Sequence, residues 1–277
     1  MTSRRYSKWT FACLAIALAA SVAIGCATSM TGRQQLLLFP ETQMAQMGAA
    51  AFTDMQSKTP RSASSTKVTY VRCVTNAITQ VVQPEQMRAV SVAAWEVELF
   101  EDDSANAFAL PGGKIGVHTG LLQVATTPGQ LAAVLGHEVG HVLDRHSNAR
   151  VSQGTLADMG MQFGSILLGA ETPQKQALMA ALGVGVQYGA LMPFSRGQES
   201  DADLIGLDLM ARAGFDPNES VTLWQNMARA GGAAPPEFLS THPSSATRIS
   251  QLQAAIPKVM PLYQQAQAAG RRPSCRP

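Results

Sequence analysis

Three residues in the middle of the chain have types and spacing suited to metal chemistry. His137, Glu138 and His141 form the pattern His-Glu-x-x-His. On a helix, side chains four residues apart lie on one face, one turn apart. Two imidazoles placed in this way can bind one tetrahedral zinc ion at about 2.1 Å. Glu138 would lie beside the ion, where its carboxylate can take a proton from a metal-bound water. The motif predicts His137 and His141 as zinc ligands and Glu138 as a general base.

A catalytic zinc ion also needs a third protein ligand and an open fourth position. His146 follows His141 by five residues, so we expect it to point away from the metal face. A carboxylate is the alternative, and Glu199 and Asp203 lie one helical turn apart. We expect Glu199 to bind the metal and Asp203 to accept the outer N–H of a zinc-bound histidine. Taken alone, the two acids could also be surface residues of an exposed helix.

Helix-capping patterns precede both segments. The sequence Thr-Pro-Gly-Gln from Thr127 has the form of a capping box with proline at the first helical position, and we expect this helix to reach His146. Ser-Arg-Gly-Gln from Ser195 repeats the box, and that helix should end before Gly214. Gly140 would let another backbone or a substrate approach the histidine helix closely. Two capped helices, one with the histidines and one with the acids, favour a shared site.

The remaining pattern predicts an α+β fold that is mainly helical. Alternating residues predict a half-buried strand over 92–100, followed by an antiparallel hairpin with strands 106–110 and 114–118. Helical periodicity and helix-start signals predict helices at 41–58, 66–82, from 216, 243–256 and 258–269.

We divide the chain into a signal peptide (1–25), a tether (26–40), one domain (41–270) and a basic tail (271–277). Residues 149–194 are rich in Gly, Ala and Met and are predicted to be an amphipathic helical hairpin packed on that domain. A poor membrane span within this segment is the alternative.

Several motifs in combination resemble the gluzincin metallopeptidases of the HtpX and CAAX-prenyl-protease type, and the soluble bacterial envelope members look closest. They are His137-Glu138-x-x-His141, Ser195-Arg196-x-x-Glu199-x-x-Ala202-Asp203, Asn106-Ala107-Phe108, and Thr241-His242-Pro243 followed by Arg248. The resemblance covers about residues 30–256. It implies a zincin-like fold with one zinc ion and a small antiparallel sheet beside the active-site helix.

The resemblance also implies roles for residues outside the two helices. Asn106, Ala107 and Phe108 would form an edge strand that binds extended substrate, which agrees with the free backbone groups that such an edge offers. His242 would point into the cleft and stabilise the oxyanion. Arg248 is assigned to substrate binding, although pairing with an acid is an open alternative.

The N-terminus has the features of a targeting signal and of a membrane anchor. Basic residues at positions 4, 5 and 8 precede an uncharged apolar stretch at 11–24, and Cys26 follows the expected cleavage site. This resembles a bacterial lipoprotein signal, in which Cys26 is acylated and holds the protein on the lipid bilayer. By resemblance, Ala27 at the second mature position favours the outer membrane if the cell is Gram-negative. An ordinary signal peptide or an uncleaved anchor is the alternative.

Composition bears on which binding partners to expect, and the cysteine content bears on possible disulfides. The chain of 277 residues is 46% hydrophobic and 14% charged, and without the basic N-terminus it is close to neutral. A near-neutral body gives no electrostatic reason to expect nucleic-acid binding. In addition to Cys26, the mature chain contains Cys73 and Cys275. These two cysteines could pair in an oxidising compartment. Their pairing is left open, because sequence does not show whether they are close in space.

These observations predict a zinc-dependent endopeptidase of the bacterial cell envelope, facing the periplasm and acting on unfolded or misassembled envelope proteins. The rival hypothesis is a zinc-containing envelope lipoprotein that acts as a chaperone or assembly factor with little proteolysis. Structural zinc sites usually close all four positions with Cys or His. Because the sequence shows no apparent fourth ligand, the enzyme is favoured.

Overall fold

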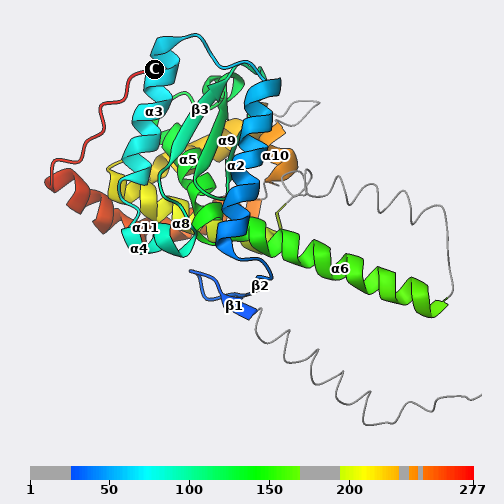
Figure 1. The fold of residues 1–277 in the computed structure, drawn as a ribbon. Helices are drawn as coiled ribbons and strands as arrows, with labels where there is room; N and C mark the ends of the chain where they lie inside the picture. Colours follow the sequence, from blue (N-terminus) through cyan, green and yellow to red (C-terminus); the bar gives the residue numbers. More distant parts are fainter. Residues whose placement is uncertain (1–25, 169–193, 231–236, 243–245) are drawn as a thin grey trace, which may run out of the picture.

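The computed structural model describes residues 26–168, 194–230, 237–242 and 246–277 (Figure 1). The expected fold class is confirmed, since a mainly helical body surrounds a small sheet. Its helices are α2 (Glu41–Lys58), α3 (Ser65–Thr79), α4 (Pro84–Ala89), α5 (Pro128–Leu143), α6 (His146–Leu168), α8 (Arg196–Ala213), α9 (Asn218–Ala230), α10 (Glu237–Thr241) and α11 (Ala246–Ala268). A short 3-10 helix, η1 (Thr119–Gln123), follows the sheet.

The central sheet has the strand order β3–β5–β4, with β3 (Glu96–Phe100), β4 (Ala107–Leu110) and β5 (Lys114–His118). Strands β4 and β5 form the predicted antiparallel hairpin, and β3 adds in parallel on the far side of β5. Strand β4 is therefore an edge. The predicted strand over 92–100 begins only at Glu96, because the residues before it form a turn.

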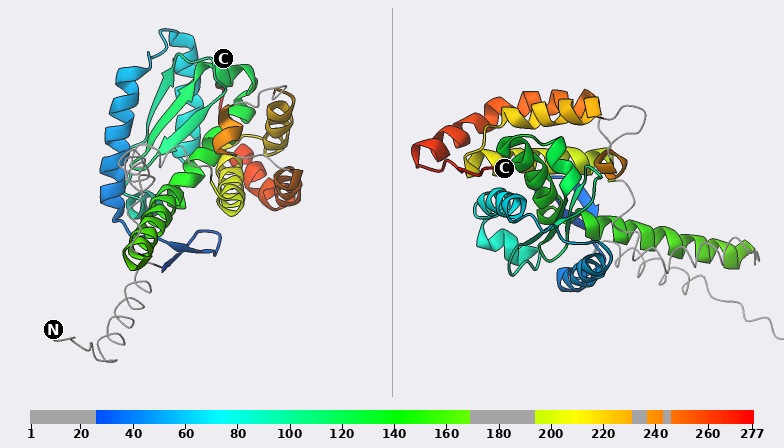
Figure 2. Two further views of the ribbon diagram at one scale, coloured as in Figure 1. Left: turned by 90° about the vertical axis from the view of Figure 1, so that its right-hand side faces the viewer. Right: turned by 90° about the horizontal axis from the view of Figure 1, so that it is seen from above.

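Helices lie on both faces of the sheet (Figures 1 and 2). Ala107 and Ala109 of β4 join the large core made with α3 and α5. Phe108 and Leu110 point to the other face, where they pack with Phe52 of α2. The sheet is thus covered by α3 and α5 on one face and by α2 on the other.

Helix α5 lies in the core, and α8 crosses it at very short range. A Cβ on Gly206 of α8 would lie 2.6 Å from the His137 backbone nitrogen, and one on Gly140 would lie 2.9 Å from the Ala202 carbonyl oxygen. Only glycine allows the two backbones to come this close. The approach expected at Gly140 is therefore made by another helix, and it brings the acids of α8 to the histidines of α5.

Three helical expectations need correction. Helix α5 ends at Leu143 rather than at His146, because Arg145 has a positive φ of 57° before α6 begins. Thr127 caps α5, but the Gln130 side chain accepts from the N–H of residue 126, so the box is not reciprocal. The two helices predicted around residue 257 are one helix, α11. Pro257 and Pro261 are exposed, so water can satisfy the carbonyls that they leave unpaired.

The expected tether contains an ordered ribbon. Strands β1 (Cys26–Thr28) and β2 (Gln34–Leu36) pair in antiparallel fashion. The ribbon is tied to the body where the Met30 N–H donates to Asp144 Oδ1 at 2.6 Å and Arg33 pairs with Asp201 at 2.8 Å. The segment described as a tether is therefore in part a packed element.

Further expectations concern the long insert and the cysteines. Helix α6 forms the first part of the predicted 149–194 hairpin and extends from the body (Figure 2), whereas residues 169–193 lie outside the described residues. Within the described part of the chain, every helix is too short or too polar to cross a bilayer. Cys73 of α3 and Cys275 form a disulfide with a Cα–Cα distance of 5.6 Å. It joins the C-terminal tail to the body.

Candidate metal centre

Four buried side chains converge where α5, α8 and α10 meet. Their ligand atoms, from His137, His141, Glu199 and His242, all lie within 4.8 Å of one another. The Nε2 atoms of His137 and His141 are 3.0 Å apart. His242 Nδ1 lies 3.2 Å from His137 Nε2 and 3.0 Å from Glu199 Oε1. The structure thus brings together the three predicted ligands and adds His242 to them.

The hydrogen bonds of His137 show which of its nitrogens faces the cluster with a lone pair. Its Nδ1 lies 2.9 Å from Asp203 Oδ1, and an ionised carboxylate only accepts. The proton therefore lies on Nδ1 and leaves Nε2 as a donor atom for a metal. Asp203 occupies the place that the sequence predicted for it.

His141 is oriented by a longer chain. His146 Nε2 lies 3.0 Å from Asp144 Oδ2, which makes this nitrogen the protonated one. The other His146 nitrogen, Nδ1, then accepts from Nδ1–H of His141 at 2.8 Å. His141 Nε2 consequently also faces the cluster with its lone pair. His146 was expected to point away from the metal face, and it does, but it contacts the outer nitrogen of a ligand.

These donor atoms fit a zinc ion. When both imidazoles are neutral, their Nε2 atoms, 3.0 Å apart, have no bond to make with each other, and a cation between them would satisfy both. Ligands of a tetrahedral zinc ion are separated by about 3.4 Å when each bond is about 2.1 Å long. His141 Nε2 and Glu199 Oε1 are 3.4 Å apart, and His137 Nε2 and Glu199 Oε2 are 3.5 Å apart. Imidazole and carboxylate donors at these separations match zinc chemistry.

Arg248 does not line the cleft, which corrects its assignment to substrate binding. Its Nε and Nη2 donate to the two oxygens of Asp203 at 2.7 Å each, and Nη1 lies 2.6 Å from Glu199 Oε2. Burial opposes ionisation of Asp203, but the charge of Arg248 and its hydrogen bonds lower the pKa of that carboxyl below its ordinary value. Arg248 therefore pairs with Asp203, behind the histidine ligands, and with the ligand carboxylate of Glu199, which is the alternative that the sequence left open.

Glu138 lies beside the cluster, as the motif predicts. Its Oε2 accepts from the Ala109 N–H of the edge strand at 3.0 Å, and its Oε1 is 3.4 Å from His242 Nε2. Burial raises the pKa of Glu138 above its ordinary value. A carboxylate with a raised pKa is better suited to accept and return a proton near neutral pH.

His242 lines the same pocket as Glu138, in agreement with the expectation, but it also belongs to the cluster of possible metal ligands. The resemblance implied a histidine that faces the cleft beside an open metal position. In the structure its Nδ1 lies within the cluster, 3.2 Å from His137 Nε2 and 3.0 Å from Glu199 Oε1, while its Nε2 faces Glu138. Its ring is stacked on Phe238 at a centroid distance of 4.4 Å, which holds it in this orientation. A loop histidine before proline gave no signal of such a contact.

Phe194 is a site residue that sequence reasoning missed. Its ring stacks on His141 at a centroid distance of 3.8 Å, and the Arg150 guanidinium lies 3.5 Å above the ring centroid. Phe194 directly precedes the cap of α8, and its N–H donates to the Thr241 carbonyl at 3.2 Å. Only its position next to Ser195 could have drawn attention to it.

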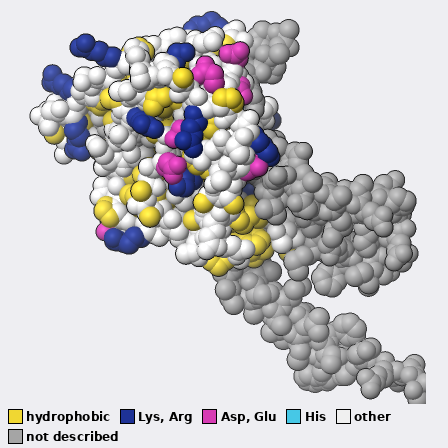
Figure 3. All heavy atoms as spheres, turned by 45° about the horizontal axis from the view of Figure 1, so that its top comes forward, with side chains coloured by type: hydrophobic (Ala, Val, Ile, Leu, Met, Phe, Trp, Pro, Cys, Tyr) yellow, Lys and Arg dark blue, Asp and Glu magenta, His cyan; other side chains and the backbone are white. Residues whose placement is uncertain are grey.

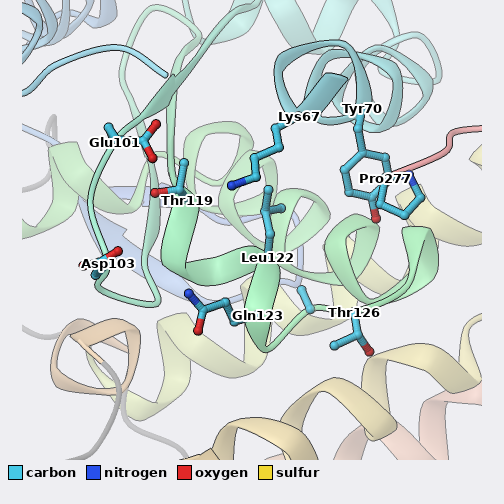
Figure 4. Close-up of a pocket in the computed structure, with 10 residues that line it drawn as sticks. Lys67, Tyr70, Glu101, Asp103, Thr119, Leu122, Gln123, Thr126 and Pro277 are labelled. Carbon is cyan, nitrogen blue, oxygen red and sulfur yellow. The ribbon is translucent and has the colours of Figure 1, made fainter. Parts of the chain in front are cut away.

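The predicted edge residues lie at the site. Asn106, Ala107 and Phe108 line a pocket that also contains Glu138 and His242. Another cavity, of about 320 Å³, lies between α3 and η1, where Figure 4 shows Lys67 and Tyr70 at its wall. The residues around that second cavity include none of the metal cluster, so the chemistry belongs to the pocket at β4.

Two histidines one turn apart, a carboxylate from a neighbouring helix and a glutamate beside them define a zinc metallopeptidase site of the gluzincin kind. The chain belongs to peptidase family M48, whose model matches residues 69–256. The relationship predicted from the motifs is therefore confirmed.

Several proteins similar to this chain are also named as metalloendopeptidases or proteases. The chain is 37% identical over 166 residues to the mitochondrial metalloendopeptidase OMA1 of Schizosaccharomyces pombe, covering 59% of this chain and 47% of that protein. It is 32% identical over 246 residues to the OMA1 metalloendopeptidase of Danio rerio, covering 84% and 50%. It is 33% identical over 201 residues to the beta-barrel assembly-enhancing protease of Escherichia coli, covering 68% and 41%. The chain thus matches half or less of the length of each of these relatives.

Proposed function

We propose that the protein is a zinc-dependent endopeptidase. The observation that carries this proposal is the placement of Glu138 between the four-residue cluster and the edge strand β4. When bound, zinc would lower the pKa of a coordinated water and polarise the scissile carbonyl. His137, His141 and Glu199 would hold it. Glu138 takes the proton of the attacking water and passes it to the leaving amine.

Strand β4 is suited to hold the substrate. The His118 N–H donates to the Asn106 carbonyl, so the alternating pattern of an antiparallel pair directs the peptide groups of Ala107 and Ala109 away from β5, to the outer edge of the strand. The Ala109 N–H is bound to Glu138, which places the general base at the strand. An extended peptide that adds to this edge brings its backbone beside Glu138. Recognition of backbone rather than of a folded surface favours unfolded segments as substrates.

For hydrolysis, the His242 side chain has to move so that a water molecule can bind the metal. A catalytic zinc site keeps a position for water, and His242 Nδ1 lies among the possible ligand atoms, 3.0 Å from Glu199 Oε1. Rotation of its ring away from His137 would open that position. The side chain would then remain close enough to Glu138 to act as the oxyanion donor that the family resemblance implies.

The same contact favours one alternative function. A closed set of four protein ligands is typical of structural zinc sites. A zinc-containing chaperone or assembly factor with little proteolysis would need no more than this arrangement. The enzyme is nevertheless preferred, because a structural site gives no role to the buried carboxylate of Glu138 at 2% exposure.

We place the protein in the bacterial cell envelope, facing the periplasm and held on the bilayer, most readily that of the outer membrane, through acylated Cys26. The name of the Escherichia coli relative, which refers to β-barrel assembly, supports an envelope role, whereas the OMA1 relatives are named as mitochondrial. Cys26 opens the exposed ribbon strand β1, where an acyl chain can leave the surface. On the face drawn in Figure 3, acidic and basic side chains are interspersed.

The proposal is tested by comparing the full chain with Glu138→Gln. We expect both to bind one zinc ion, and we expect the variant to lose about 100-fold or more of its casein cleavage, since general-base removal has effects of that order. Glu85→Gln, an exposed glutamate on α4, is the matched control. Equal cleavage by zinc-loaded wild type and Glu138→Gln would overturn the role of the base. A zinc-loaded wild type that leaves casein intact but suppresses aggregation of an unfolded protein would favour the chaperone.

A further inference from the structure

A pocket of about 180 Å³ opens beside the metal centre on the face of β4 that α2 covers. Its wall is largely apolar. Three methionines and a small residue of α2 face two side chains of β4: Met44, Met47, Ala51, Met55, Phe108 and Leu110. Methionine side chains adapt their shape, so such a wall accepts large apolar groups of different outline.

The pocket is continuous with the reacting groups. Glu138 and His242 line it together with the α2 methionines. An extended peptide on the β4 edge presents alternate side chains to opposite faces. Those directed to the α2 face enter the pocket, whereas the other face is closed by α5 and the buried Ala107 and Ala109. One substrate side chain next to the scissile bond is therefore directed into this cavity.

The polar lining of the pocket includes the Arg150 guanidinium as well as the Glu138 carboxylate. The Arg150 guanidinium is stacked on Phe194, and both residues line the cavity. Burial lowers the pKa of Arg150 to about 10, so it stays protonated at neutral pH. A lysine or arginine side chain entering the pocket would lose water in an apolar wall and face this like charge.

We propose that this pocket is a specificity subsite that accepts one large apolar side chain, such as Leu, Met or Phe, adjacent to the scissile bond and rejects a basic one. The inference rests on the proposed endopeptidase function. The pocket would hold about six water molecules at about 30 Å³ each, and an apolar side chain would displace them. The subsite gives the enzyme a preference for stretches of chain that a folded protein keeps in its core.

The experiment uses two extended peptides that differ at one position, Leu or Lys, next to the cleaved bond. For the wild-type full chain we expect kcat/KM to be about 10-fold or more higher for the Leu peptide, the size of effect that apolar pockets give. Ala51→Glu puts a carboxylate on the exposed rim of the wall, while Ala50→Glu on the same helix is exposed and outside the pocket. We expect Ala51→Glu to lower kcat/KM for the Leu peptide and raise it for the Lys peptide.

The outcomes separate the two proposals. A change of opposite sign for the two peptides cannot come from misfolding, which would lower both. Equal cleavage of the Leu and Lys peptides by the wild type would overturn the subsite and leave the endopeptidase intact. The same behaviour of Ala51→Glu and Ala50→Glu would also overturn it. No cleavage of either peptide or of casein by zinc-loaded protein would instead contradict the proposed function.

Discussion

The metal centre has an inner side and an outer side that are built in different ways. On the inner side, His137 and His141 come from α5, and Glu199 and Asp203 come from α8, two regular helices whose backbones touch through glycines. On the outer side, His242 follows the five-residue helix α10 and is held by ring stacking and its neighbours.

The difference concerns how firmly each ligand is positioned. The Nδ1 atoms of His137 and His141 are each hydrogen-bonded to a second group, Asp203 and His146 respectively. The orientation of each ring is therefore fixed both by its helix and by this hydrogen bond. His242 uses both ring nitrogens within the site itself, at Glu199 and at Glu138. We infer that metal affinity is determined mainly by the inner side and that access to the metal is determined by the outer side.

The strongest way to break the inner side is Gly206→Ala. A Cβ at this position would lie 2.6 Å from the His137 backbone nitrogen and 2.7 Å from the Gly136 carbonyl carbon, so the helices must separate. Overpacking of a core costs about 1–3 kcal/mol, occasionally more, and here the clash is with backbone. We expect loss of zinc binding and a lower thermal midpoint, measured by metal content and by circular dichroism.

Gly154→Ala is the matched control for that substitution. Gly154 lies in α6, and a Cβ there would have no heavy atom within 4 Å. Alanine at an unstrained helical glycine raises stability by about 0.4–1 kcal/mol. If Gly206→Ala behaved like Gly154→Ala, the close helix crossing would not position the site.

Removal of single ligands sharpens the comparison between the two sides. Glu199→Ala removes an inner carboxylate and leaves Arg248 facing the gap, so we expect it to lose zinc. His242→Ala leaves the other three ligands in place, and we expect it to keep one zinc ion with reduced affinity. Zinc competition with a chelator measures both. Retention of zinc by Glu199→Ala together with its loss in His242→Ala would reverse the assignment of the two sides.

The inner side could be predicted from the sequence because its information is local and periodic. Helical spacing alone places His137 beside His141 and Glu199 beside Asp203. Capping signals locate the starts of both helices. The contact between the helices does not follow from spacing, but glycine at position 140 on the histidine helix indicated a close approach.

The outer side could not be predicted in the same way. His242 and Phe194 lie next to segment ends with no periodic pattern, and their contacts join positions that are far apart in the sequence. The role of Arg248 was ambiguous because a buried and an exposed arginine look alike in sequence. His146 was correctly predicted to point off the metal face. The turn that brings it to His141 requires a positive φ at Arg145, and arginine is not a residue type that indicates a positive φ.

The smallest expected effect tests the chain of contacts behind His141. His146→Leu removes the acceptor for Nδ1–H of His141 and leaves a buried donor without a partner. Loss of such an outer contact lowers metal affinity about 10- to 100-fold. His146→Asn keeps an acceptor and should restore part of the affinity, which a merely steric role would not explain. His118→Leu is the control, because His118 is bonded to Ser104 at 2.7 Å and lies outside the ligand cluster. Chelator competition on all three variants gives the ranking, and equal affinities for His146→Leu and His118→Leu would mean that zinc binding at His141 depends on the helix alone.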